Sequence, residues 1–390
     1  MEKKSAKASN THRSAHSPER VGPGRMVIKL GTNLLTAATE RLDLQVMSSI
    51  VSQVAKLKER GVELVIVSSG AIAAGRRKLC AGPERRDVPF KQVLASVGQS
   101  SLMSSYEQLF AWHDITVAQA LLTRADLSDR HGYLNARNTL LALMELGVIC
   151  VVNENDVVAI DEIRGAKFGD NDNLSAMVSN LVDADMLVIL TDIDGLYTAD
   201  PHKDPTATLI SRVDAIDEQI QRLAGGSSSQ RGTGGMTTKL EAARLATASG
   251  AAVVITRGTI PDVLVRLAAG EMVGTFFSPT ASKHESRRRW LLSGLAARGK
   301  VVVDEGAAGA LSRQNKSLLP AGILAVQGTF VRGETIEILS QNKKRLGYGI
   351  TNYGSEEVKS IMGSHSDRIA SILGHEYGDE VVHKNNLVVL

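Results

Sequence analysis

The sequence predicts an α/β protein built around a mainly parallel β-sheet, followed by a small β-rich domain. From Met26 onward, short apolar runs alternate with longer amphipathic segments, a pattern typical of repeated β-α-β units. After about Pro279 this alternation gives way to short β-like runs. With 390 residues, the chain is long enough for two or three domains that each bury a core of their own.

Six apolar runs are the strand candidates of the first domain, and amphipathic segments between them are the helix candidates. The predicted strands are Met26–Leu30, Glu63–Val67, Ile115–Leu121, Val148–Val152, Met186–Leu190 and Ala252–Thr256. The predicted helices are Leu42–Glu59, Lys91–Phe110, Asn135–Leu146, Leu174–Val182 and Thr237–Ser249.

The second part of the chain begins with a segment rich in Lys and Arg at residues 280–300, which we interpret as a linker or an edge helix. The β-like runs Val301–Val303, Gly322–Val326 and Glu334–Leu339 follow it. We therefore expect a tail at 1–25, a first domain at 26–279, a linker at 280–298 and a β-rich domain at 299–380.

Composition narrows the class of protein. With 43% hydrophobic and 22% charged residues and a mean hydropathy of −0.03, the chain fits neither a disordered nor a fibrous protein. Residues 1–25 hold six Lys/Arg against Glu2 and Glu19, a net charge of +4, which leaves −1 of the total of +3 for residues 26–390. The folded part thus lacks the basic excess typical of nucleic-acid binding.

Three further features bear on location. The two cysteines, Cys80 and Cys150, have no metal-ligand or disulfide spacing, so we expect free thiols in a reducing compartment such as the cytoplasm. The longest strongly apolar stretches, such as Met186–Leu190, fall far short of the roughly 20 residues that cross a membrane. The polar tail is expected to be disordered, with a targeting or tethering segment as the alternative.

Small and polar residues follow the predicted strands, at the sheet edge where parallel α/β proteins bind their ligands. They are Gly31-Thr32-Asn33 after the first strand, Ser68-Ser69-Gly70 after the second, Asn153-Glu154-Asn155-Asp156 after the fourth and Thr191-Asp192 after the fifth.

Three common ligand-binding motifs do not match the residues predicted at this edge of the sheet. An EF-hand starting at Asp170 would need Gly and Glu where the chain has Ser175 and Leu181. The segment GTGGMTTK at 232–239 lacks the Gly-Lys-Ser/Thr order of a P-loop, and it does not match the Gly-x-Gly-x-x-Gly dinucleotide fingerprint either.

Two lysines nevertheless point to phosphate. Lys239 stands in the first turn of a helix that follows a glycine-rich run, where backbone amides and the helix dipole favour an anion. Lys29 interrupts a buried strand, where an unpaired ammonium would cost several kcal/mol. The alternative for the glycine run is a flexible connection without a ligand.

Acids and amides cluster in GDNDN at 169–173 and again in NENDVV at 153–158. An Asx-rich turn capping the next helix would explain one or two of them. Together they predict a pocket for a small zwitterion, and with the lysines they indicate phosphoryl transfer to an amino acid. A carboxylate acceptor is already ionised at neutral pH, so the reaction needs no general base, only cations and Mg²⁺ around the phosphates.

The ordered segments VIKLGTNLL, VIVSSGAIAAGR, LASVGQSSLM, LLTRADL, YLNARNTL, VVNENDVVA, FGDNDNLSA, LTDIDGLYTADP and GTGGMTTKLEAARLA resemble the motif series of the glutamate 5-kinase family. The resemblance runs from about Met26 to Ser278. It implies the amino acid kinase fold, a three-layer sandwich with a mainly parallel central sheet, and a reaction that moves the ATP γ-phosphate onto the γ-carboxylate of L-glutamate at the start of proline biosynthesis.

The resemblance also assigns roles residue by residue. Lys29 and Lys239 would flank the transferring phosphoryl group, and Asp172 would orient them or help to place the metal. Glutamate would be held by Ser69, Asp156 and Asn171, with Asn153, Glu154 and Asp170 close by. ATP would contact Lys29, Thr191, Asp192, Thr233, Gly234, Gly235, Met236, Thr237, Thr238 and Lys239, while Mg²⁺ would be held mainly by the ATP phosphates.

The segments VVVDEGAAGAL, SLLPAGILAVQGTFVRGE and YGITNYGSEEV resemble the PUA domain that some members of this family append. PUA domains elsewhere bind RNA. The folded part of this chain has no excess of basic residues, which argues against that role here unless a local basic patch supplies the charge. The resemblance further implies inhibition by proline and a homo-oligomer, a dimer or a tetramer. In the segment LTDIDGLYTADP, Ile193 and Asp194 stand where the resemblance implies that the residue types vary among these kinases.

Two alternatives stay open from the sequence. A kinase of the same fold could act on aspartate, N-acetylglutamate or a nucleoside monophosphate. A protein of another class could bind or modify RNA through its C-terminal domain.

Overall fold

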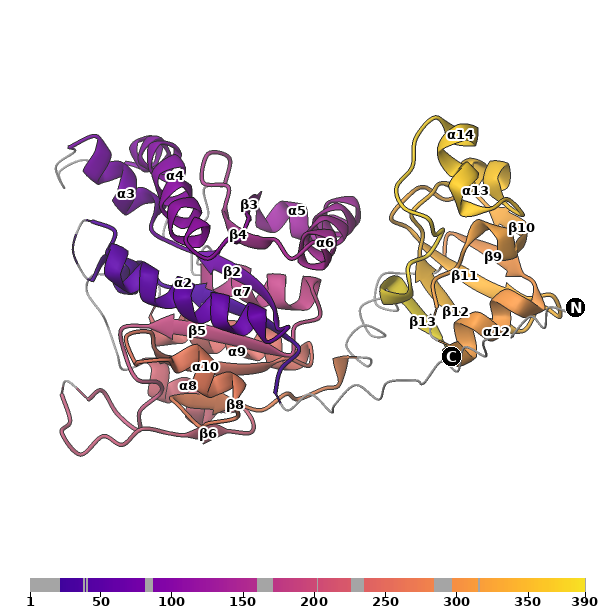
Figure 1. Ribbon diagram of the computed structural model, residues 1–390. Helices are drawn as coiled ribbons and strands as arrows, with labels where there is room; N and C mark the ends of the chain where they lie inside the picture. The colour runs from indigo at the N-terminus through magenta and orange to yellow at the C-terminus, as the bar shows by residue number, and fades with distance from the viewer. Residues whose placement is uncertain are drawn as a thin grey trace, which may run out of the picture.

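The computed structural model describes residues 22–37, 39, 41–80, 87–159, 171–201, 203–225, 235–283, 297–314 and 316–389. Two separate β-sheets organise them, each in its own unit (Figure 1). The strands of the first sheet are β1 Arg25–Leu30, β2 Glu63–Ser68, β3 Val117–Leu122, β4 Ile149–Glu154, β5 Met186–Thr191, β6 Arg212–Val213, β7 Ala252–Arg257 and β8 Thr275–Phe277.

The first sheet has the order β3-β4-β2-β1-β5-β7-β8-β6, and the strands from β3 to β7 run parallel. Only β8 reverses direction against β7, with β6 parallel to β8. The chain first extends the sheet from β1 through β2 and then continues from β5 on the other side of β1. Ligands of such sheets bind at the carboxyl ends beside the strand where this reversal occurs.

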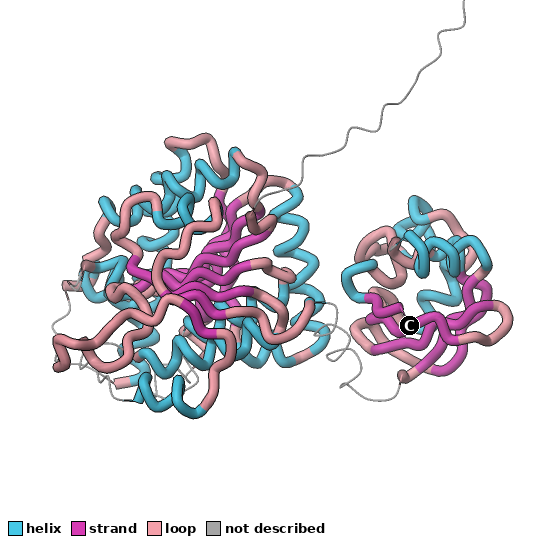
Figure 2. Tube along the Cα trace, turned by 90° about the horizontal axis from the view of Figure 1, so that it is seen from below, coloured by secondary structure: helices cyan, strands magenta, loops and turns pink. Residues whose placement is uncertain are grey.

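Helices cover both faces of the first sheet, so that the strands form a middle layer (Figure 2). They are α1 Thr32–Thr36, α2 Leu44–Glu59, α3 Ala71–Lys78, α4 Val88–Ala111, α5 Arg124–Ser128, α6 Arg130–Glu145, α7 Asn171–Leu181, α8 Glu218–Gly225, α9 Met236–Ala248 and α10 Val263–Ala268. Side chains of α2, α4 and α10 share one core with the sheet, and side chains of α6, α7 and α9 share the other.

The second unit contains a five-stranded sheet in the order β10-β9-β11-β12-β13. Its strands are β9 Gly299–Val303, β10 Ile323–Gly328, β11 Thr335–Ser340, β12 Arg345–Ile350 and β13 Leu387–Val389. Its helices are α12 Glu305–Gln314, α13 Ser355–Ile361 and α14 Ile369–Leu373, with short 3-10 turns at Pro320–Gly322, Ser366–Arg368 and Lys384–Asn386. A core of its own supports this unit.

The two units touch at helix α6. Leu134 packs with Ile350 and Val388, and all three are buried. Next to this contact, the Arg130 guanidinium donates a 2.7 Å hydrogen bond to Thr335 Oγ1. The contact is therefore apolar at its centre and polar beside it.

The predicted α/β fold with a β-rich second sheet is confirmed, but several boundaries were wrong. Helix α4 begins at Val88 rather than Lys91, because Asp87 caps it by accepting a hydrogen bond from the Phe90 N–H at 3.0 Å. Helix α6 begins at Arg130 rather than Asn135, where Asp129 caps it in the same way.

Several elements were not predicted from the sequence. Short strands such as β6 and β8, and β12 and β13 of the second sheet, carry too few residues for a period-2 pattern or contain glycine. Among the described residues, no helix is both long and apolar enough to cross a membrane.

Candidate active site

Two lysines that are distant in the sequence share one buried carboxylate. Lys29 lies in β1, Asp172 in the first turn of α7 and Lys239 in the first turn of α9. The Nζ of Lys29 lies 2.6 Å from Asp172 Oδ1, and the Nζ of Lys239 lies 3.2 Å from Asp172 Oδ2. All three side chains are almost fully buried. The two ammonium groups bring positive charge to the starts of α7 and α9, which suits a phosphate.

The charge of Asp172 is set by these neighbours. Burial alone would raise its pKa, but Lys29 and Lys239 outweigh burial and hold the pKa of this carboxyl well below its usual range. The Thr238 hydroxyl adds a hydrogen bond of 2.8 Å to Oδ2. Asp172 therefore stays ionised and fixes the position of both lysines.

An amide network lies beside this centre. The side-chain N–H₂ of Asn171 donates to Ser69 Oγ at 3.0 Å, to Asn153 Oδ1 at 3.0 Å and to the backbone oxygen of Ser68 at 3.3 Å. The Oδ1 atom of Asn171 is buried and has no hydrogen-bond partner among the described residues. This oxygen is consequently available to a ligand that donates hydrogen bonds, such as an ammonium.

Asp156 gives the same region its acidic character. Burial, with a smaller contribution from Glu154, raises the pKa of Asp156 to about 7. An arriving ammonium would offset the cost of burying this carboxylate, so the pair Asp156 and Glu154 favours a cationic group.

The next polar group follows β5. Asp192 accepts hydrogen bonds from the Thr191 hydroxyl at 2.9 Å and from the Asn33 amide at 3.1 Å. These bonds outweigh burial and lower the pKa of Asp192. Asp194 forms a two-point ion pair with Arg257 at the end of β7, at 2.7 and 2.9 Å. This ion pair connects the loop after β5 to the end of β7.

The start of α9 carries the described part of the glycine-rich segment. Gly235 stands at the N-cap, where no side chain of the described residues caps the helix, and the first N–H groups of a helix favour an anion. Met236 and Thr238 are buried, and Thr237 is exposed. Asp170, Thr233 and Gly234 lie outside the described residues.

The structure brings Lys29, Lys239 and Thr238 together on Asp172, and it joins Asn171 to Ser69 and Asn153. Asp156 lies near Glu154, which lines a separate pocket, and Thr237 is exposed. Sequence reasoning missed Gln99 of α4, which accepts a 2.8 Å hydrogen bond from the Asn153 amide. It also missed Tyr106, whose hydroxyl lies 2.8 Å from Ser68 Oγ. Both residues lie in α4, a helix that was predicted from its apolar residues alone, so its polar side chains drew no attention. Helix α7 begins at Asn171 rather than Leu174, so the acid-amide run forms its first turn.

Comparison with known proteins identifies two family models in the chain. The amino acid kinase family matches residues 24–257, and the PUA domain matches residues 299–373.

Three curated relatives are similar over nearly the whole chain, and each is a glutamate 5-kinase. The protein of Dehalococcoides mccartyi (strain CBDB1) is 59% identical over 366 residues, which is 94% of this chain and 98% of the relative. That of Herpetosiphon aurantiacus is 52% identical, over 93% of this chain and 98% of the relative. That of Shewanella oneidensis is 50% identical, over 94% and 98%.

Proposed function

The chain belongs to the glutamate 5-kinase branch of the amino acid kinase family, and from that membership we propose that it transfers the γ-phosphoryl group of ATP to the side-chain carboxylate of L-glutamate. The single observation that supports this reaction best is the pair of lysines on Asp172, with an amide and carboxylate pocket beside it. One part suits a triphosphate, and the other suits an amino acid.

The glutamate pocket has a defined chemistry in this proposal. The Oδ1 atom of Asn171 and the carboxylate of Asp156 receive the ammonium group, while Ser69 and the amide of Asn153 hold the rest of the backbone of glutamate. Glu154 and Asp170 add negative charge near this end of the sheet. The side chain of glutamate then extends toward Lys29.

The reaction joins a glutamate oxygen to the γ-phosphorus as the bond to the β,γ-bridging oxygen of ATP breaks, and ADP leaves with that electron pair. The attacking carboxylate carries its charge already, so no residue has to remove a proton. Lys29 and Lys239 offset the repulsion between the two anions and the charge that develops on the phosphoryl oxygens. Asp172 keeps both amines in place.

We propose that ATP lies along the start of α9 and the end of β5. The first N–H groups after Gly235 suit its phosphates, and Thr191 and Asp192 lie at the neighbouring strand end. Thr233, Gly234, Met236, Thr237 and Thr238 complete the segment assigned to the nucleotide.

Magnesium is proposed to arrive with the nucleotide and to neutralise part of its phosphate charge. The described residues contain no cluster of three or more His, Cys, Asp or Glu that could hold a metal ion. The oxygens of Asp172 are engaged by Lys29, Lys239 and Thr238. The described residues therefore do not form a metal site of their own.

A substrate panel tests the reaction. The purified chain is incubated with ATP, Mg²⁺ and hydroxylamine, which converts acyl phosphates into hydroxamates, and with glutamate, aspartate or N-acetylglutamate. ADP release with a nucleoside monophosphate is measured in parallel. We expect hydroxamate from glutamate only. Product from another acceptor, with none from glutamate, would replace glutamate kinase by one of the related activities.

We also propose that the product feeds proline synthesis, that proline competes with glutamate and that the enzyme works in the cytoplasm as a homo-oligomer. The first two points rest on what the resemblance to the glutamate 5-kinase family implies, and the two free cysteines support a reducing compartment. The apolar edge strand β3 offers a contact for a second copy. Proline should raise the KM for glutamate without lowering kcat, and analytical ultracentrifugation should find a dimer or a tetramer.

The two domains are proposed to divide at the linker of residues 280–298, after a tail at 1–25 and a catalytic domain at 26–279. We extend the PUA-like domain beyond residue 380, because β13 pairs with β12.

RNA binding by the PUA-like domain remains the competing function. In this domain Lys300 and Arg345 both form ion pairs with the buried Glu337, which reduces the positive charge that they offer to a phosphate backbone. RNA binding that falls with salt and survives deletion of residues 1–280 would favour this competitor.

A further inference from the structure

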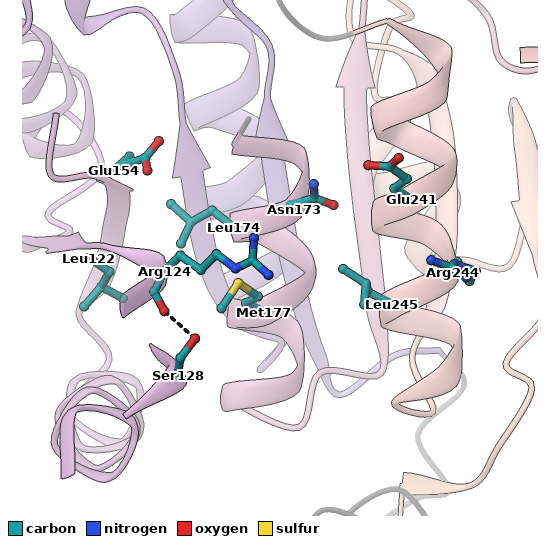
Figure 3. Close-up of a pocket in the computed structure, with 10 residues that line it drawn as sticks. All are labelled: Leu122, Arg124, Ser128, Glu154, Asn173, Leu174, Met177, Glu241, Arg244 and Leu245. Atoms are coloured by element: carbon teal, nitrogen blue, oxygen red, sulfur yellow. Dashed lines mark hydrogen bonds between the residues drawn. The ribbon is translucent and has the colours of Figure 1, made fainter. Parts of the chain in front are cut away.

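A second pocket lies along helix α7, and it shares Glu154 with the residues proposed for the glutamate pocket. Helix α7 forms its floor, and α5 and α9 stand on either side (Figure 3). The cavity has a volume of about 380 Å³. Its apolar lining comes from Leu122, Leu174, Met177 and Leu245. Such a surface suits a ligand with a hydrophobic body.

Two buried oxygens in this pocket have no hydrogen-bond partner within the part of the chain that the structure describes. They are Oδ1 of Asn173, a residue only 7% exposed, and Oε2 of Glu241. Figure 3 shows the two side chains pointing toward one another across the gap between α7 and α9. Two acceptors that face each other without a donor are unfavourable, and a group with several N–H donors placed between them would satisfy both. An ammonium has this property.

The pocket also offers cations. Arg124 of α5 and Arg244 of α9 line it, and in Figure 3 Arg124 extends over the floor beside Leu174 and Met177. With Glu154 and Glu241 on the same lining, the charges of the two signs are equal in number. This balance disfavours a polyanion such as a nucleotide and suits a molecule that carries one charge of each sign.

We propose that this pocket is a second binding site, separate from the Lys29, Asp172 and Lys239 centre, for a zwitterionic amino acid with a large apolar side chain. The ammonium lies between Asn173 and Glu241, the side chain covers Leu174 and Met177, and the carboxylate pairs with Arg124. Glutamate itself is disfavoured here, because its charged side chain would lie on the apolar floor.

Isothermal titration calorimetry on the full chain tests the site. L-leucine and L-phenylalanine are titrated in the presence of saturating L-glutamate and a non-hydrolysable ATP analogue, so that the active centre is filled. We expect saturable binding of at least one of them, with one molecule per chain. Isoamylamine and phenethylamine lack the carboxylate, and 4-methylpentanoate and 3-phenylpropionate lack the ammonium. Each should bind at least tenfold more weakly than its parent amino acid.

Variants locate the binding. Glu241→Gln and Arg124→Gln should each weaken it at least tenfold, and Leu245→Trp should abolish it by filling the cavity. The matched control is Glu218→Gln on α8, which removes an exposed glutamate paired with Arg222 and should leave binding unchanged. A cooperative thermal unfolding transition, at a temperature close to that of the original chain, shows that each variant still folds.

Three outcomes would overturn the proposal. They are the absence of saturable binding by either amino acid, binding that disappears when glutamate is added, and binding that is unchanged in Glu241→Gln. The readout is heat of binding, so it does not depend on which acceptor the enzyme phosphorylates.

Discussion

At the scale of single residues, the site works by placing charges where water is excluded. Lys29 and Lys239 would each be costly to bury alone, and Asp172 lowers that cost by pairing with both. Lys239 also lies close enough to Asp192 to help lower the pKa of that carboxyl. In the proposed function, the phosphates of ATP bind beside both ammonium groups.

Lys239→Ala tests the role of the second ammonium. We expect kcat to fall about 10²–10³-fold, the usual effect of removing one group that stabilises transition-state charge, while the KM for glutamate changes little. Initial rates of ADP release measure both constants. Lys56→Ala is the control, since Lys56 pairs with Asp262 on the surface and should not matter. Unchanged turnover would remove Lys239 from the reaction.

Asp156 should make glutamate use depend on pH. Because its pKa is raised to about 7, the carboxyl is neutral below that pH and cannot pair with the ammonium of glutamate. The kcat/KM for glutamate should be constant well above pH 7 and fall about tenfold per pH unit below it. Asp156→Ala should raise the KM and remove this pH step. A normal KM in the variant would assign the ammonium to other residues.

At the scale of elements, the glutamate pocket depends on how closely two helices meet. Helix α3 starts directly after Ser69 and Gly70, and it packs against α4 through glycines. A Cβ atom at Gly98 would lie 1.7 Å from the backbone oxygen of Ala71, and one at Gly75 would lie 1.8 Å from that of Leu94. The two backbones can approach this far only because both positions lack a side chain.

Gly98→Ala should therefore separate α3 from α4. We expect a loss of about 1–3 kcal/mol of stability from overpacking, with weaker glutamate binding because the Ser69 loop moves with α3. Calorimetric melting temperatures and the KM for glutamate measure the two effects. Gly309→Ala in α12 is the matched control, because nothing lies within 4 Å of a Cβ there and alanine should stabilise that helix by about 0.5–1 kcal/mol. Equal melting temperatures for the two variants would contradict the close contact.

At the scale of the whole molecule, the two units have separate cores, and the described residues proposed for the kinase reaction all belong to the first. The described contacts between the units include Leu134 against Ile350 and Val388, the bond from Arg130 to Thr335, and His131 beside Gly333. All of them come from helix α6 on the side of the first unit.

Leu134→Ser should loosen this contact without affecting catalysis. The radius of gyration from small-angle X-ray scattering should increase, because the second unit loses an apolar contact. The kcat should stay within about twofold of the original, a change of about 0.4 kcal/mol, because the described residues proposed for the reaction lie in the first unit. Leu146→Ser, at the exposed end of the same helix, is the control and should change neither quantity. An unchanged radius in Leu134→Ser would mean that other contacts hold the units together.

The sequence by itself determined the six parallel strands and five of the helices of the first domain, the polar residues at the carboxyl ends of the strands, and the unusual burial of the Lys29 ammonium. These follow from hydrophobic periodicity and the cost of burying a charge, which are properties of short segments. The short strands β6 and β8 were not predicted, because two or three residues are too few to show the alternation of a β-strand.

Only the tertiary structure decided which residues meet. That Lys29 and Lys239 share Asp172, that Gln99 reaches Asn153, and that Asn173 faces Glu241 across the gap between α7 and α9 all depend on how helices pack on the sheet. Side chains far apart in the chain are brought together by the summed packing of many apolar contacts, and no local pattern carries that information.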